Sequence, residues 1–246
     1  SGSSIDLNST SDSVSGNFEY NGPVTVGGPT SSMLTMSAAN ISFQSTIDSA
    51  ASVLNGLVLN SQGTTSFSGA IGATNQLGSL TTDAGGTTQL AGGPVNTSDA
   101  QTFGDTVELG ADTSLSSANE SISFASAVDS DTTARTLNIS SGSTVSFDAA
   151  VGSSNALASL TLAATGTTFA DDVTTTGIQN YSTPVTLLND VTFEGAEGQF
   201  AGGLDGNQKD LALNFIAPVT IDGSETFGNI ANLSVQNAAN LSGTIN

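Results

Sequence analysis

Carboxylates are the residues of this chain with the clearest chemical potential. Aspartates recur just after an apolar residue at corresponding points of the sequence, namely Asp48, Asp129 and Asp205. Hard cations such as Ca²⁺ bind several oxygen ligands, which turns commonly supply. The calcium-binding repeat GGxGxDxUx and the EF-hand spacing are absent, although the segment 202–207 (GGLDGN) partly resembles the former. Calcium is therefore the one cofactor that the sequence suggests, with these three aspartates as its candidate ligands.

Paired carboxylates are the remaining route to catalysis, because two of them at a suitable separation hydrolyse glycosides. Candidate pairs are Asp171 with Asp172, Asp129 with Asp131, and Glu194 with Glu197. None of these pairs lies beside a Trp or Tyr that would stack on a sugar, and Asp is a common turn residue. The chain has no His and no Cys, which removes Ser-His-Asp and Cys-His arrangements. We therefore expect no catalytic residue and a protein that is not an enzyme.

The chain has two basic residues, Arg135 and Lys209. Each stands two residues before a leucine, Leu137 or Leu211, and Asn55 holds the same place before Leu57. This correspondence suggests a shared cation position that pairs with an acidic residue of a neighbouring coil. Solubility of an exposed surface is the alternative explanation.

Charge and composition exclude several classes of function. The net charge is −20, and nucleic-acid binding needs Lys and Arg to displace counterions from phosphates. Anionic membrane surfaces are disfavoured for the same reason, and no apolar run is long enough to span a bilayer. We therefore expect neither nucleic acid nor membrane insertion. With no Cys, stability must come from packing and backbone hydrogen bonds.

The chain repeats itself at a spacing of about 80 residues. The stretch TFGDTVELGADTSLSSANESISFASAVD (102–129) has counterparts at 19–48 and, more degenerate, at 180–205. We expect one continuous body over 1–246, with copies at about 20–101, 102–179 and 180–246 and an N-terminal strand segment or partial coil at 1–19. Self-similarity at a fixed period is typical of arrays, which mostly serve as scaffolds and binding surfaces.

Short strands should carry these repeats. Segments such as Val24–Val26, Ile41–Phe43 and Leu57–Leu59 alternate apolar and small polar residues, with Gly, Asn, Asp and Ser between them. The least strand-like pieces, 70–80 and 150–160, should form loops or a turn of helix. This pattern predicts an all-β, right-handed parallel β-solenoid in which short strands stack at ~4.8 Å. Tandem immunoglobulin-like β-sandwiches are the alternative, disfavoured by the absence of Trp and the shortness of the strands.

A copy of about 80 residues would hold about four coils of about 20 residues each. Equivalent residues of successive copies would then lie in shared interior columns, four coils apart. The aromatic residues expected in these columns as core are Phe43, Phe124, Phe200, Phe67 and Phe147. Core packing is the expected role of such aromatic residues, and a ligand-stacking platform is the alternative.

The repeated units, together with GSTVSFDAAVGSSNALASLTL (142–162), resemble the β-strand repeats of giant bacterial surface proteins. These include filamentous-haemagglutinin-like adhesins and autotransporter-type stalks. The resemblance covers most of the chain from about Glu19 onward and lies in composition and rhythm. It implies a secreted, extracellular or cell-surface solenoid that forms a stalk, fibre or matrix.

Both ends of the sequence read as strand without a capping helix, around Ile5 and Leu7 and around Leu241 and Ile245. An uncapped terminal coil offers unpaired N–H and C=O groups that template association. We therefore expect either an excerpt from a longer array or a subunit that stacks on itself head to tail, as a structural part of an extracellular bacterial filament. An adhesin that binds cell-surface glycans is the second possibility, and a β-helix carbohydrate enzyme is the third.

Overall fold

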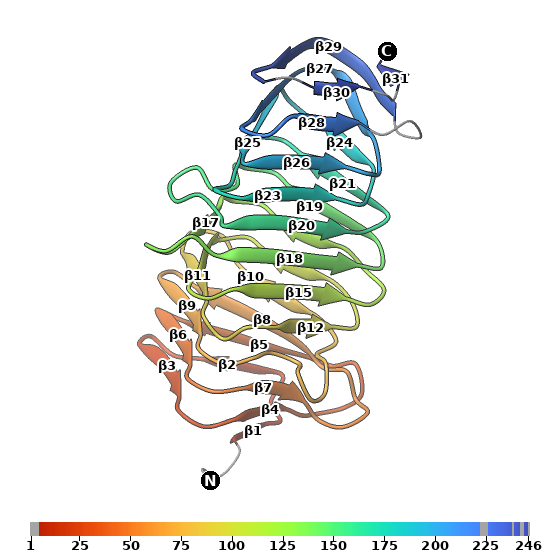
Figure 1. Cartoon of the computed structure of the whole chain (residues 1–246). Coiled ribbons are helices and arrows are strands. Elements are labelled where there is room, and N and C mark those ends of the chain that lie inside the picture. Colours follow the sequence, from red (N-terminus) through yellow and green to blue (C-terminus); the bar gives the residue numbers. More distant parts are fainter. Residues whose placement is uncertain (1–4, 222–225, 238, 242–243, 246) are drawn as a thin grey trace.

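The chain folds into an elongated three-sided β-solenoid of about ten turns, seen in a computed structural model (Figure 1). The structure describes residues 5–221, 226–237, 239–241 and 244–245. Every pairing between its strands is parallel, and no helix occurs among the described residues. None of them therefore forms a helix able to cross a membrane. The predicted all-β parallel solenoid is confirmed, and the sandwich alternative, which requires antiparallel sheets, is wrong.

Three parallel sheets, which we call the first, second and third faces, run along the solenoid axis. The first face contains β1 (Ile5–Leu7), β4 (Val24–Val26), β7 (Ile47–Ser49), β12 (Val95–Thr97), β15 (Thr113–Ser117), β18 (Thr136–Ser141), β20 (Ser159–Ala163), β23 (Ile178–Tyr181), β26 (Glu197–Phe200), β28 (Val219–Ile221) and β30 (Ala239–Leu241). The second face contains β2 (Ser11–Ser13), β5 (Met33–Ala38), β8 (Gly56–Ser61), β10 (Leu80–Thr82), β13 (Gln101–Phe103), β16 (Ile122–Phe124), β19 (Thr144–Phe147), β21 (Gly166–Phe169), β24 (Val185–Leu187), the first parts of β27 (Leu204–Phe215) and β29 (Thr226–Val235), and β31 (Thr244–Ile245). The third face contains β3 (Asn17–Tyr20), β6 (Asn40–Phe43), β9 (Thr64–Phe67), β11 (Thr87–Leu90), β14 (Thr106–Leu109), β17 (Val128–Ser130), β22 (Val173–Thr174), β25 (Val191–Gly195) and the second parts of β27 and β29. Two loops interrupt the faces, where the single residues Ile71 and Val151 bridge β7 to β12 and β17 to β22.

Alternation of residue type sets which side chains enter the solenoid. In β16, for example, Ile122 and Phe124 are buried while Ser123 between them faces outward, as the period of two in a strand requires. Interior residues of successive turns then stack in register. Ring centroids of Phe103 and Phe124 are 5.1 Å apart, and those of Phe124 and Phe147 are 4.8 Å apart. The core is therefore a set of columns built from residues that pair in register between successive turns.

Turn length decides which residues share a column. Successive first-face residues are separated by 19 residues from Ile5 to Val24 and by 24 from Leu115 to Ile139. An 80-residue spacing therefore covers fewer than four turns. From β6 to β16 the chain advances by ten strands and the Ile71 bridge, which is eleven positions and not a multiple of three.

The expectation of one shared column for Phe43, Phe124 and Phe200 was therefore wrong. Phe43 lies on the third face with Phe67, Phe124 lies on the second face with Phe147, and Phe200 lies on the first face against Tyr181. All five predicted core phenylalanines are buried, with exposed fractions of 1% or less. Equivalent residues of the repeated stretches thus sit on different faces of the solenoid.

Two interior glutamines occupy matching environments. The Nε2 of Gln101 donates to Val95 O, Thr97 Oγ1 and Ser116 O. The Nε2 of Gln179 donates to the equivalent atoms, Val173 O, Thr175 Oγ1 and Glu194 O. The two sites differ at the amide oxygen. Gln179 Oε1 accepts a 2.8 Å bond from the Tyr181 hydroxyl, whereas Gln101 Oε1, with Phe103 in the corresponding place, has no partner.

Candidate assembly surface

Among the described residues, the first strand of each face at the N-terminal end pairs along one edge alone. Among the described residues β1 pairs with β4, β2 with β5 and β3 with β6, and none of them has a second partner. In β1, Ile5 N donates to Pro23 O at 2.8 Å, and Leu7 O accepts from Gly27 N at 2.7 Å. Because backbone groups of successive strand residues point to opposite edges, the N–H and C=O of Asp6 face outward from the end.

The same analysis applies to β3. Gly16 O and Tyr20 O accept from the turn above, from Ala39 N at 2.7 Å and Gln44 N at 2.8 Å. The N–H and C=O of Glu19 consequently face the open edge. A row of unpaired backbone groups of this kind is a template for another parallel strand.

Apolar side chains lie just inside these edges. Ile5, Leu7, Phe18 and Tyr20 are half-buried and pack against the core. Their partners in the next turn, such as Val26 and Phe43, are 1% exposed or less. Contact of another turn with these side chains would therefore remove apolar surface from water.

One carboxylate lies among these interior positions. Asp12 pairs in register with the fully buried Met36, so it occupies the inward-facing place of β2. Leu59, Thr82 and Phe103 fill that place in the following turns. Ser9 Oγ donates to Asp12 Oδ2 at 2.8 Å.

The pKa of the neighbouring Tyr20 phenol is raised in this arrangement. Burial raises the pKa of Tyr20, and the negative charge of Asp12 raises it further. Tyr20 stacks on Phe43 with centroids 5.2 Å apart, so its ring belongs to the interior. Sequence reasoning missed Asp12 because β2 (SDS) carries no apolar residue and so lacks a strand signal.

The C-terminal end has a related organisation. In the described part, β30 pairs with β28 and β31 pairs with β29. Leu233 and Val235 of β29 are half-buried against the core, as Ile5 and Leu7 are at the other end. Of the residues expected at this end, Ile245 pairs with Phe227 and is 38% exposed. The backbone of Leu241 pairs with Ile221, and its side chain lies outside the described part.

The three candidate calcium ligands are not brought together. Asp48 lies on the first face, Asp129 on the third and Asp205 on the second. Within the described residues, no group of three or more Asp or Glu side chains is arranged to hold a metal ion. The aspartates do not form one site.

Two of these aspartates anchor the loops that interrupt the faces. Asp48 Oδ1 accepts from Thr74 N at 2.8 Å and from Asn75 N at 3.0 Å. Asp129 Oδ1 accepts from Ser154 N at 2.8 Å and from Asn155 N at 3.2 Å. Backbone N–H groups that donate to a carboxylate oxygen stabilise its negative charge and lie where a cation would otherwise bind. The recurrence of these residues therefore reflects recurrence of the loop.

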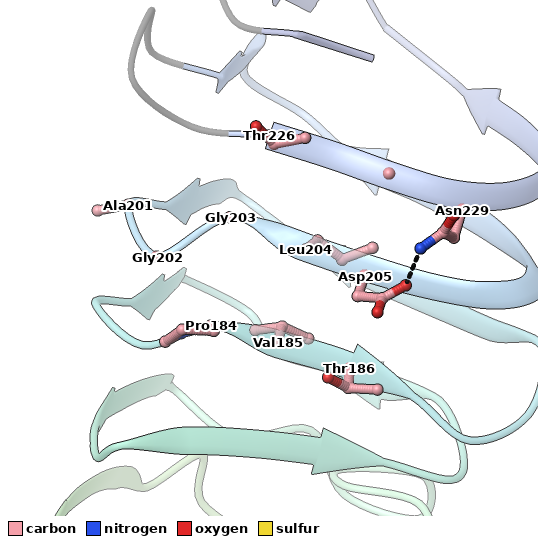
Figure 2. Close-up of a pocket in the computed structure, with 11 residues that line it drawn as sticks. Pro184, Val185, Thr186, Ala201, Gly202, Gly203, Leu204, Asp205, Thr226 and Asn229 are labelled. Atoms are coloured by element: carbon pink, nitrogen blue, oxygen red, sulfur yellow. Dashed lines mark hydrogen bonds between the residues drawn. The ribbon is translucent and has the colours of Figure 1, made fainter. Parts of the chain in front are cut away.

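The third aspartate lines an open groove of about 530 Å³ on the second face (Figure 2). The groove crosses three turns, with Val185, Leu204 and Thr226 on successive rungs. Asp205 Oδ1 accepts from Asn207 N at 2.9 Å and from Asn229 Nδ2 at 3.1 Å, the bond drawn in Figure 2. Among the lining residues that the structure describes, Asp205 is the one titratable side chain.

The cation position proposed from the sequence has a different geometry. Arg135 forms a bidentate ion pair with Asp131, at 3.0 and 2.8 Å, four residues away in the same turn. This contact lowers the pKa of Asp131. In the corresponding place Asn55 is buried, and its Nδ2 donates to Gly27 O at 2.6 Å. The expected pairing with a neighbouring coil was therefore wrong for Arg135, and Asn55 makes an uncharged contact in the corresponding place.

The carboxylate pairs weighed as catalytic have structural partners. Asp172 Oδ1 accepts from Thr192 N of the next turn at 2.6 Å, and Glu197 Oε1 accepts from Gln199 Nε2 at 2.8 Å. The aromatic side chains are buried, except for Phe18 and Tyr20, which are half-buried at the N-terminal end. Comparison with known proteins finds no match, neither to a family model nor to a curated protein nor to a solved structure.

Proposed function

We propose that this solenoid is a structural unit of an extracellular bacterial filament or stalk, elongated by head-to-tail stacking of copies at their open ends. The observation that carries the proposal is that β1, β2 and β3, one on each face, pair along a single edge within the described part of the chain. A partner that forms hydrogen bonds with all three strand edges must supply three parallel strands arranged around an apolar interior. A turn of the same solenoid has that geometry.

Further support comes from the chemistry of the two ends. Half-buried apolar residues lie at both, with Ile5 and Leu7 at one end and Leu233 and Val235 at the other. A heterologous contact between two different surfaces does not close on itself, so it produces an open filament. The extracellular location rests on the resemblance of the repeated stretches to those of bacterial surface proteins.

Proline substitution at the edge tests the proposal. Proline removes the N–H of its own residue, so Asp6→Pro and Glu19→Pro together delete two outward-facing donors and leave the hydrogen bonds of Ile5, Leu7 and Tyr20 in place. The matched control is Asp6→Asn with Glu19→Gln, which removes the same two charges and keeps both N–H groups. Association of the three proteins is compared by sedimentation velocity over a range of protein concentration.

We expect the unmodified chain and the amide control to form end-to-end oligomers, while the proline variant stays monomeric with an unchanged melting temperature. Equal association of the proline variant and the control would show that the N-terminal edges are not the contact. Monomers throughout would contradict the proposal.

A further inference from the structure

We propose that a groove beside the loop around Ile71, which we call the loop groove, binds a short neutral oligosaccharide. The groove has a volume of about 470 Å³, and two loops form its walls. Residues of the segment 50–54, which follows β7, line the first wall, and residues 72–76 line the second. Asn96 of β12 and Ser116 of β15 pair in register on the first face and complete the lining. This inference goes beyond the proposed function and does not require end-to-end assembly.

Hydrogen bonds to the body of the solenoid hold both walls in place. In the second wall, Thr74 N and Asn75 N donate to Asp48 Oδ1 at 2.8 and 3.0 Å. At the end of the first wall, Asn55 is buried, and its backbone O accepts from Gly78 N at 2.9 Å, which joins the two loops. A groove whose walls are fixed before binding loses little conformational entropy when a ligand enters it.

The loop around Val151 has the same anchor, so it shows which features of the groove the fold requires. Asp129 accepts from backbone N–H groups there, as Asp48 does in the loop groove. Ala156 stands in the place of Gln76, one residue after the anchored N–H groups. Because the loop forms with alanine at this place, the fold does not require the glutamine amide. The Gln76 side chain is half-buried and lines the groove, where it can bond to a ligand.

The first wall contains one residue more than its counterpart after β17. The backbone N of Asn55 donates to Ser49 Oγ six residues earlier, whereas the backbone N of Arg135 donates to Ser130 Oγ five residues earlier. The longer segment places Leu54 in the groove with 39% of its surface exposed. Leu54 has a φ of 50°, in the left-handed region that a leucine rarely adopts. Backbone strain of this kind is typical of positions that contact a ligand.

The polarity of the lining indicates the class of ligand. Every described lining residue is uncharged, in a chain that contains 22 Asp and Glu. The amides of Asn75 and Gln76 and the hydroxyl of Ser116 can each donate and accept hydrogen bonds, as sugar hydroxyls do. Leu54 offers an apolar surface to the C–H groups of a sugar ring. A cation would need carboxylate ligands, and an anionic ligand would need Arg or Lys, so a neutral oligosaccharide fits this lining best.

Saturation-transfer-difference NMR on the full chain tests the site. The neutral probes are cellotetraose, mannotriose and tri-N-acetylchitotriose, and trigalacturonate is the charged counterpart. Because the signals come from sugar protons, the measurement works for a monomeric and for an assembled chain. Gln76→Ala removes the amide, and Gln199→Ala, at an exposed position of β26 on the first face, is its matched control. Leu54→Gly removes the side chain but tolerates the positive φ, and Leu188→Gly, at another exposed leucine, is its matched control. Circular dichroism verifies that every variant is folded.

We expect a neutral probe to bind with a dissociation constant of about 1 mM, because the described lining contains no aromatic ring to stack on a sugar. Trigalacturonate should not bind. Gln76→Ala and Leu54→Gly should each weaken binding by about three- to tenfold, and both controls should bind as the unmodified chain does. Absence of saturation transfer to every neutral probe, equal binding of trigalacturonate, or equal binding by all variants would overturn the proposal. Each of these results would leave end-to-end assembly untouched.

Discussion

The amide oxygen of Gln101 is unpaired, whereas that of Gln179 in a matching environment accepts a hydrogen bond. The Gln179 site therefore suggests a stabilising substitution at the Gln101 site. Tyr181 supplies a hydroxyl to Gln179 Oε1, two residues before it, and Phe103 stands in the same relation to Gln101. Phe103→Tyr should complete the site at Gln101. A hydrogen bond to a buried, otherwise unsatisfied acceptor stabilises by about 1–2 kcal/mol. For a chain of this size that corresponds to a rise in melting temperature of roughly 2–4 °C for each kcal/mol.

The reciprocal change, Tyr181→Phe, should lower the free energy of unfolding by about 1–3 kcal/mol, because it orphans Gln179 Oε1. Phe124→Tyr is the matched control. Phe124 is the neighbour of Phe103 in the same column and is equally buried, but Ile122 takes the place of the glutamine. Its new hydroxyl should find no acceptor there and should destabilise the fold. Thermal and denaturant unfolding, followed by circular dichroism, measure all three variants. Destabilisation by Phe103→Tyr equal to that by Phe124→Tyr would refute the reasoning.

Other predictions concern the loops, a buried carboxyl and the core. Asp129→Ala should cost about 1–3 kcal/mol, because two backbone N–H groups lose their acceptor; hydrogen exchange should quicken at Ser154 and Asn155 while Thr74 and Asn75 stay protected. A chelator should leave the melting temperature unchanged, since backbone N–H groups already occupy Oδ1 of both Asp48 and Asp129; a marked fall on chelation would contradict this. Burial raises the pKa of Asp105, whose folded state therefore holds its proton more tightly than the unfolded chain; the penalty on its charged form is absent below the ordinary Asp pKa and grows as pH rises through the folded value. Asp105→Asn, which keeps an acceptor for Gly86 N, should thus raise the melting temperature at pH 7 and have little effect near pH 3; an equal shift at both values would count against it. Phe147→Ala should cost about 3–5 kcal/mol through loss of a fully buried ring, measured by denaturant unfolding, and a cost below 1 kcal/mol would contradict the stacked-column core.

Much of the fold follows from local sequence. Period-two alternation and turn residues identify strands such as β4 and β10 within a residue of their bounds. The segments 70–80 and 150–160 lack this alternation, and they form loops that join the faces only through isolated bridging residues. The face on which each strand lies was not predictable, because it depends on the summed length of every preceding turn. A turn that is longer by a few residues keeps the same local alternation, but it moves the repeated residues that follow it to another face of the solenoid.

The candidate sites likewise depend on contacts between residues of different turns. Recurrent Asp48 and Asp129 were visible in the sequence, but their partners lie 26 or 27 residues and 25 or 26 residues ahead, in the next turn. The partial burial of Phe18 and Tyr20 becomes apparent only when their place in the first described turn is known. Asp12 carries no signal until its register with Met36 places it inside.

Helical reconstruction of assembled material by cryo-electron microscopy tests the central claim most directly. The account predicts fibres whose axis coincides with the solenoid axis. Their rise per subunit should be about 50 Å, from about ten turns at roughly 4.8 Å each. Strand spacing should continue unbroken through the junction between β1–β3 of one copy and the C-terminal turn of the next. Fibres in which the solenoids lie across the axis, or junctions that leave the N-terminal edges in solvent, would contradict it.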